Sequence, residues 1–305
     1  MKILVTHPGK IGDCFWALPT ARAIAESYGE KVDFMSSAGF TSHLPLIQAQ
    51  PYIARAGYCA EWEVQNTAPM TPVTPPPEGK YVSFTSHRGA SEGLEFGEVP
   101  LEVTRDYDRV FHLGYPAWPT ARLAEYVYQQ ALQQNETGPG AAPSRVWTIL
   151  NPLDLSRPWI VALSPDRRRR VAVGFTDEWA ELKAGLLGAA EHALPGSTLL
   201  LLAPPGGSRL DTEWSDVGCP SYRADWVQTA NLIAGADLFL GCLSSQAVLA
   251  MALGIPRVLV EPNPHRHHEI FQHPDCPLVL GNDGKPTFDA RHVADALREK
   301  LQEVK

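Results

Sequence analysis

The chain has 305 residues, 44% of them hydrophobic and 20% charged, the composition of an ordinary globular protein. Its net charge of −8 and pI near 5.7 argue against broad electrostatic attraction to nucleic acid or anionic lipid. Five scattered cysteines without C-x-x-C spacing argue against a disulfide framework and a structural zinc site, and fit a reducing cytoplasm. No apolar run reaches 18 residues and the N-terminus lacks a signal-peptide core, so we expect no transmembrane segment.

The first half of the chain alternates between strand and helix patterns. The segment 66–80 carries five prolines and is predicted to be an irregular surface loop. In chain order, the expected elements are a strand over 3–6, a helix over 15–27, strands over 31–36, 81–86 and 108–113, and a helix over 119–134.

A segment with linker composition, 135–145, precedes a second series of the same kind. This series comprises a strand over 159–165, a helix over 176–193, a strand over 197–205, a helix over 225–236, a strand over 237–241, a helix over 244–254, a strand over 256–262 and a helix over 289–304. Two such series predict an α/β protein with two Rossmann-like domains whose parallel sheets face a central cleft. We expect the first domain over 1–150 and the second over 151–288, with 289–305 packing back on the first domain.

The turn after the first strand, "HPGKIGD", matches neither a P-loop nor a G-x-G-x-x-G dinucleotide fingerprint. It places Gly12 and Asp13 at the sheet edge where ligands bind in open α/β folds. Glycine allows close approach of a ligand to the backbone. Asp13 can serve either as a helix cap or as a general base that faces the cleft. Position alone leaves both roles open.

The run "SPDRRRR" at 164–170 is expected to follow the strand over 159–165 and to lie at the same kind of edge. The planar guanidinium of arginine suits diphosphate oxygens, whereas the alternative is a solvated basic patch. We favour diphosphate binding. The candidate residues are Ser164, Arg167, Arg168, Arg169 and Arg170.

Two further segments carry polar side chains that suit a donor site. Ser244, Ser245 and Gln246 open an Ala-rich helix, where they form either an anion site or a plain N-cap. His265 and His268 belong to a histidine-rich stretch whose spacing does not match H-E-x-x-H. We therefore expect a polar loop that contacts donor sugar or phosphate, and no metal site.

Together these segments resemble the family 9 glycosyltransferases, that is, the ADP-heptose:lipopolysaccharide heptosyltransferases and their relatives. The resemblance rests on "GKIGDCFWALPTARAIAE", on "VALSPDRRRR" followed by "TDEWAEL", and on "LIAGADLFLGCLSSQAVLAMALGIPRVLV". The stretch from about 40 to 110 has no recognisable counterpart. The family has an Asp-Thr/Ser-Gly turn and a histidine in its last motif, and here those positions hold Leu243, Ser244, Ser245 and Val248.

The resemblance implies a GT-B fold and an inverting, metal-independent glycosyltransferase that needs no cofactor besides its nucleotide-sugar donor. Asp13 would be the base, with Lys10, Gly12 and Arg88 on the acceptor side. The arginines and the Ser244–Gln246 helix start would hold the diphosphate. Glu261, at the end of a strand, is placed for the ribose, and His265 and His268 for nucleoside or sugar.

Several alternatives stay open on the sequence. A sugar-nucleotide epimerase also uses two such domains, and Leu243 keeps a non-catalytic sugar-nucleotide-binding module in play. The acceptor is expected to be a hydroxyl of a glycan or a lipid-linked saccharide. A modified DNA base ranks below these, with Arg88, Arg105 and Arg109 as a local basic track.

Overall fold

The structure, a computed structural model, describes most of both halves of the chain. The described residues are 1–38, 41–59, 64–69, 81–87, 90–96, 101–114, 122–137, 148–165, 170–174, 183–195, 198–202, 221–222, 225–242, 244–261, 278–280 and 289–303. They form two units, Met1–Trp159 and Ile160–Lys305. No helix in these ranges is long and apolar enough to span a bilayer.

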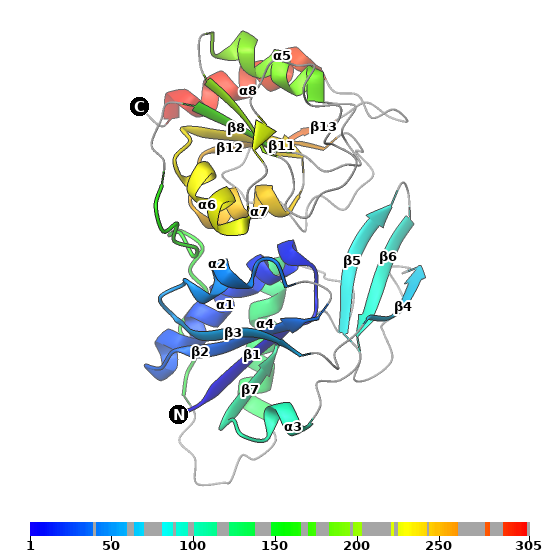
Figure 1. Cartoon of the computed structure of the whole chain (residues 1–305), viewed down its shortest axis with the longest axis vertical. Helices are drawn as coiled ribbons and strands as arrows, with labels where there is room; N and C mark the ends of the chain where they lie inside the picture. Colours follow the sequence, from blue (N-terminus) through cyan, green and yellow to red (C-terminus); the bar gives the residue numbers. More distant parts are fainter. Residues whose placement is uncertain are drawn as a thin grey trace. The chain divides into compact units, whose positions relative to one another are not determined.

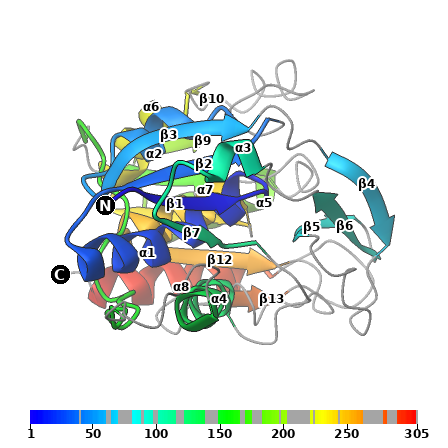
Figure 2. The ribbon, with the colours of Figure 1, turned by 90° about the horizontal axis from the view of Figure 1, so that it is seen from below.

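The first unit contains a parallel sheet with the strand order β3-β2-β1-β7 (Figures 1 and 2). Its strands are β1 (Ile3–His7), β2 (Val32–Ser37), β3 (Ile53–Cys59) and β7 (Arg109–His112). β1 is buried along its whole length, since it lies between β2 and β7. This central position explains its continuous run of β-branched and apolar residues. The sequence predicts β1, β2 and β7 to within a residue or two, but not β3.

The helices of this unit are α1 (Ile11–Tyr28), α2 (Leu44–Gln48), α3 (Leu101–Thr104) and α4 (Leu123–Thr137). α1 and α4 pack against each other, and α2 packs on β3. α1 begins four residues before the expected start at 15, because Lys10 is its N-cap and the turn is shorter than predicted. It ends at Gly29, whose φ of 67° is left-handed.

A second sheet of the first unit is antiparallel, with the order β4-β6-β5. Its strands are β4 (Val64–Pro69), β5 (Tyr81–His87) and β6 (Ala90–Phe96). The predicted irregular loop over 66–80 is therefore wrong at its start, where Asn66 to Pro69 pair with β6. Residues 70–80 lie outside the described residues. Pro69 ends the edge strand β4, where a missing N–H costs no ladder bond.

The second unit is built on a parallel sheet with the order β10-β9-β8-β11-β12-β13. Its strands are β8 (Arg170–Gly174), β9 (Thr198–Leu202), β10 (Ser221–Tyr222), β11 (Leu238–Cys242), β12 (Arg257–Glu261) and β13 (Leu278–Leu280). Counted along the chain, this is the Rossmann order 3-2-1-4-5-6. The two parallel sheets confirm the predicted α/β class.

Helices cover both faces of this sheet: α5 (Lys183–Ala193) and α8 (Ala290–Glu303) lie on one, and α6 (Trp226–Ala234) and α7 (Ser245–Ala252) on the other (Figure 1). α8 contributes Val293, Ala294 and Leu297 to the core beneath α5. The terminal helix is thus part of the second unit, whereas the sequence analysis assigned it to the first. The apolar residues of α8, at i, i+1 and i+4, form one face that packs against the core of the second unit.

The predicted strand over 159–165 is wrong. Residues 159–165 form no strand, and Val161 and Leu163 are 53% and 61% exposed. The first strand of the second unit is β8, which begins at Arg170 and pairs with both β9 and β11. The central place in the sheet is occupied by the apolar run at 171–173, and Val171, Ala172 and Val173 are all buried there.

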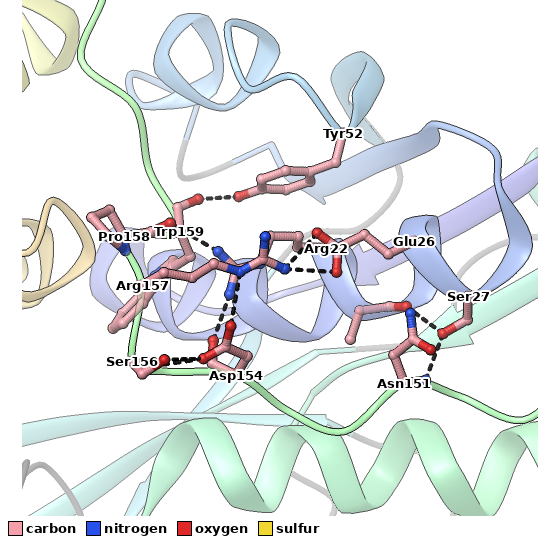
Figure 3. Close-up of polar contacts among 11 residues, drawn as sticks. Arg22, Glu26, Ser27, Tyr52, Asn151, Asp154, Ser156, Arg157, Pro158 and Trp159 are labelled. Carbon is pink, nitrogen blue, oxygen red and sulfur yellow. Dashed lines mark hydrogen bonds and ion pairs between the residues drawn. The ribbon is translucent and has the colours of Figure 1, made fainter.

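Residues 150–159 explain why the first unit ends nine residues later than the predicted boundary at 150. Figure 3 shows this segment running alongside α1, with its backbone carbonyls accepting hydrogen bonds from side chains. Arg22 of α1 donates to the carbonyl oxygens of Asp154 and Pro158, the latter at 2.8 Å, and the hydroxyl of Tyr52 donates to the carbonyl of Trp159. The backbone of 150–159 is therefore part of the first unit.

Trp159 completes this attachment at the N-terminal half of α1. Its indole stacks on Trp16, with ring centroids 6.2 Å apart, and its Nε1 donates to the carbonyl oxygen of Phe15 at 3.2 Å. That carbonyl cannot accept the usual helical bond, because residue i+4 is Pro19, which has no N–H. Trp159 thus satisfies an acceptor that the proline leaves open.

Candidate functional site

Both parallel sheets have a topological switch point, where successive connections leave on opposite sides. In the first sheet this point lies between β1 and β7, and in the second between β8 and β11. Open α/β sheets bind ligands outside the carboxyl ends of strands at such points. Most of the described candidate residues lie at these two edges, one in each unit.

At the first edge, the turn after β1 is cross-linked by its own side chains. The amide of Gly9 donates to Nδ1 of His7 at 3.0 Å, and the amide of Lys10 donates to Oδ2 of Asp13 at 3.1 Å. Cys14 donates from its amide to the carbonyl of Lys10 at 3.0 Å, and from its thiol to that of Gly9 at 3.5 Å. The turn is therefore rigid and preorganised.

Asp13 is the third residue of α1, and its side chain is only 7% exposed. Its bond to the Lys10 amide makes it a helix cap. A capping bond to one carboxylate oxygen does not by itself decide against a role as base. The sequence places Asp13 correctly at this sheet edge, and the structure adds that the carboxylate is oriented by the turn.

Gly12 does not have the predicted role of turn glycine, because the helix begins at Ile11 and Gly12 lies in its first turn. The close approach occurs at Gly9 instead. A Cβ there would lie 2.6 Å from Cε1 of His7 and 2.9 Å from Oδ2 of Asp13, closer than real Cβ contacts. A side chain at this position would displace the imidazole or the carboxylate.

Three buried or half-buried histidines surround this edge. Burial lowers the pKa of His7 to about 3, with a further contribution from the nearby His43. Burial also lowers the pKa of His43 to about 4 and lowers that of His112, whose Nδ1 lies 2.9 Å from Oγ1 of Thr6. All three are neutral near pH 7. The sequence analysis missed them, since isolated histidines carry no spacing signal.

At the second edge, two glycines bring β8 and β11 together. A Cβ on Gly241 would lie 2.1 Å from the carbonyl oxygen of Gly174, and one on Gly174 would lie 2.4 Å from Oε1 of Gln246. Gln246 is 2% exposed and donates from Nε2 to the carbonyl of Leu202 at 3.3 Å. Its buried Oε1 has no hydrogen-bond partner among the described residues. The Gln246 side chain therefore packs against the switch point and is not displayed on the surface.

The start of α7 lies at the same edge. Ser244 is its N-cap and accepts a bond from the amide of Ala247 at 3.2 Å, so the hydroxyl of Ser244 serves as the plain cap that the sequence left open. Ser245 is the first helical residue. Glu261 ends β12 at this edge, as predicted, and is fully buried.

Arg170, the last residue of the arginine run, begins β8, and its backbone lies at the edge of the sheet opposite the start of α7. Arg170 is at the amino end of that strand and Gly174 at the carboxyl end, about 13 Å away. Ser164 precedes the run, and its amide donates to Oδ1 of Asn231 in the middle of α6. The expectation that Arg170 and the start of α7 share one carboxyl edge is wrong, because Arg170 is the first residue of the strand.

Some predicted site residues lie outside the described residues: Arg88, Arg167, Arg168, Arg169, Leu243, His265 and His268. The side chain of Arg170 is likewise not described. Within the described part of the chain, no group of three or more His, Cys, Asp or Glu side chains is arranged to hold a metal ion.

No model of a known family matches the chain, and no curated protein sequence does. Solved structures are similar along almost its whole length. A family 9 glycosyl transferase from Veillonella parvula has a TM-score of 0.61 at 11% identity, covering 99% of this chain and 97% of its own. The Escherichia coli heptosyltransferase WaaC, solved with ADP-2-deoxy-2-fluoro heptose, has 0.57 at 13%, covering 99% of both chains.

A third similar structure is the glycosyltransferase TibC from enterotoxigenic E. coli, described as iron-containing and dodecameric. Its TM-score is 0.50 at 15% identity, and the match covers 99% of this chain and 74% of TibC. At identities this low, the likeness concerns the fold. The chain has the GT-B fold of these glycosyltransferases, with two Rossmann-like units, as the sequence resemblance predicts.

Proposed function

We propose that the protein is an inverting glycosyltransferase that moves a sugar from a nucleotide-activated donor to an acceptor hydroxyl. One observation carries the proposal: a preorganised turn places the Asp13 carboxylate at the switch point of the first sheet. The fold around it is one that glycosyltransferases use. The family 9 likeness adds that the reaction is of the heptosyltransferase type.

The donor is bound by the second unit in this proposal. Gly174 and Gly241 let β8 and β11 pack closely beside this site, and the N-terminus of α7 at Ser245 faces the diphosphate with its helix dipole. The carboxylate of Glu261 accepts from the ribose hydroxyls. Arg170 is not included, because it begins β8 at the amino end of the strand, whereas a diphosphate contact from Arg167, Arg168 or Arg169 stays a prediction.

The reaction is a single displacement. The acceptor hydroxyl gives its proton to Asp13 while its oxygen forms a bond to the anomeric carbon. The bond between that carbon and the diphosphate oxygen breaks, and the nucleoside diphosphate leaves with the bonding electron pair. The α7 N-terminus stabilises the developing negative charge, so the proposed chemistry is metal-independent.

The acceptor is a hydroxyl of a glycan or of a lipid-linked saccharide. Cys14, Cys59 and Cys242 are buried and not in a disulfide, which suits the reducing cytoplasm where we expect the protein to act. Lys10 is half-buried at the turn and is the described acceptor-side cation next to Asp13.

A thermal-shift screen against UDP-, ADP-, GDP-, CMP- and dTDP-sugars tests the donor. A bound donor at a hundredfold excess over Kd stabilises the fold by about 2.7 kcal/mol. Product analysis of the hit with and without EDTA then separates transfer from epimerisation and tests metal independence. If no nucleotide sugar shifts the melting temperature, the proposed function is wrong.

A further inference from the structure

We propose that His7 is a positioning residue for Asp13, acting as a neutral imidazole that holds the turn between β1 and α1. The role of Asp13 as base rests on the proposed function, whereas the structural part of the proposal does not. His7 is the last residue of β1 and is fully buried. Nothing in its sequence context distinguishes it from a core residue.

The first step is the bond between the imidazole and the turn. The buried amide of Gly9 donates to Nδ1 at 3.0 Å, so Nδ1 carries no proton and the proton of the neutral ring is on Nε2. Pro8, between the two residues, has no amide to offer in its place. Without His7, the Gly9 amide would be a buried donor that lacks its acceptor, and the turn would rearrange.

The second step joins the imidazole to the carboxylate. Cε1 of His7 and both Cβ and Oδ2 of Asp13 lie within 3 Å of one point, the place of a Cβ on Gly9. The ring and the carboxylate therefore both pack against the face of Gly9 that a side chain would occupy. Any shift of Gly9 moves the Lys10 amide that follows it, which is the donor to Oδ2.

The third step is that the imidazole stays an acceptor at working pH. Protonation of Nδ1 would put a donor against the Gly9 amide, but burial keeps the ring neutral near pH 7. Phe15 and His43 pack nearby, edge to face at 5.9 Å, and close this side of α1. The His7 ring thus acts as a fixed acceptor and not as a proton carrier.

The test compares the whole chain with His7→Leu, His7→Asn and His43→Leu by hydrogen exchange of peptides that cover 8–16. Asparagine can place Oδ1 where Nδ1 lies and accept from residue i+2, as in an Asx-turn. His43 is as buried as His7 but has no hydrogen bond to the turn among the described residues. We expect at least tenfold faster exchange in His7→Leu only.

Unchanged exchange in His7→Leu, or an equal increase in His43→Leu, would overturn the proposal. So would failure of His7→Asn to protect the turn. If His7→Leu does not fold, ¹⁵N spectra of the wild-type imidazole decide: a protonated Nδ1 on His7 contradicts the proposal, and a protonated Nε2 supports it.

Kinetics with the nucleotide sugar found by the screen test the link to catalysis. We expect His7→Leu to lower kcat by about 10–100-fold with an unchanged KM for the donor, and His7→Asn to restore most of it. A loss confined to KM contradicts positioning. If the wild type turns over no nucleotide sugar, the proposed function fails, while the exchange result for the turn stands.

Discussion

Nε1 of Trp159 donates to the carbonyl oxygen of Phe15, the one acceptor in α1 that Pro19 deprives of its helical partner. Trp159, the last residue of the first unit, thus supplies the hydrogen bond that Pro19 removes from α1. This relationship fixes the end of the first unit to the part of α1 that carries Asp13.

A double-mutant cycle measures this repair. Trp159→Phe leaves the Phe15 carbonyl buried without its donor and should cost about 1–3 kcal/mol. Pro19→Ala supplies a backbone N–H to the same carbonyl. In that background the cost of Trp159→Phe should be about 1 kcal/mol smaller, as determined by urea unfolding. Strictly additive effects would show that the two groups do not share this acceptor.

Arg22→Met should loosen the attachment of residues 150–159 to α1. Burial and the nearby Arg157 lower the pKa of Arg22, and its guanidinium donates to two backbone carbonyls. Loss of two charged hydrogen bonds should cost about 2–4 kcal/mol and speed hydrogen exchange over 148–159. Arg55→Met is the matched control, since Arg55 is exposed and pairs with Asp33. Equal losses in both variants would contradict an anchoring role for Arg22.

Gly241→Ala should disrupt the second edge. The new methyl would lie 2.1 Å from the Gly174 carbonyl oxygen, and backbone cannot move aside cheaply. We expect a loss of stability of at least about 2 kcal/mol in the second unit, with donor binding weakened in the thermal-shift assay. Gly57→Ala, in β3, meets nothing within 4 Å and should be tolerated. A melting temperature as high as that of Gly57→Ala would refute the close approach.

Acid should weaken the first unit through its histidines. The pKa of His43 is about 4 in the folded protein and near 6.5 when unfolded, so the unfolded chain binds more protons between these values. Stability is therefore full above pH 6.5 and falls as pH decreases. His43→Leu should gain about 2 kcal/mol relative to wild type between pH 7 and pH 5. Parallel pH profiles of unfolding would contradict a buried neutral His43.

Asp13→Asn separates the cap from the base. The amide oxygen of asparagine can still accept from Lys10, so the melting temperature should stay close to that of the wild type. Transfer to the acceptor should fall by about 10²–10⁴-fold, because an amide cannot take the hydroxyl proton. Donor binding should persist. Full activity would leave Asp13 as a cap only and favour another base or a non-catalytic binding module.

The alternation of strand and helix predicted the fold class because each central strand is apolar on both faces, as in β1 and β11. It failed at 159–165 because a segment can be apolar for another reason: Trp159 is buried on α1 and not in a sheet. That error also put Arg170 at the carboxyl edge, whereas Arg170 begins β8 at the amino end. β8 has only the short apolar run Val171–Val173 and begins with a charged residue, Arg170, so its sequence did not indicate a buried strand.

The candidate site, too, was predictable from the sequence only in part. Asp13 could be placed because the end of a first strand is visible in sequence. The structure adds that Gly9, and not Gly12, makes the close approach, since helix starts are set by capping bonds such as that of Lys10. His7 could not be found, because its role depends on one bond to an amide two residues away.

The first unit binds residues 154–159 largely through main-chain oxygens, which every amino acid possesses. Side-chain changes in most of this stretch leave those contacts intact, whereas changes at Arg22 or Tyr52 remove them. We therefore expect the sequence of residues 154–159 to vary among relatives, and Arg22 and Tyr52 to be conserved. In relatives, the segment that corresponds to 154–159 would follow the same path along α1 even where its sequence is not recognisable.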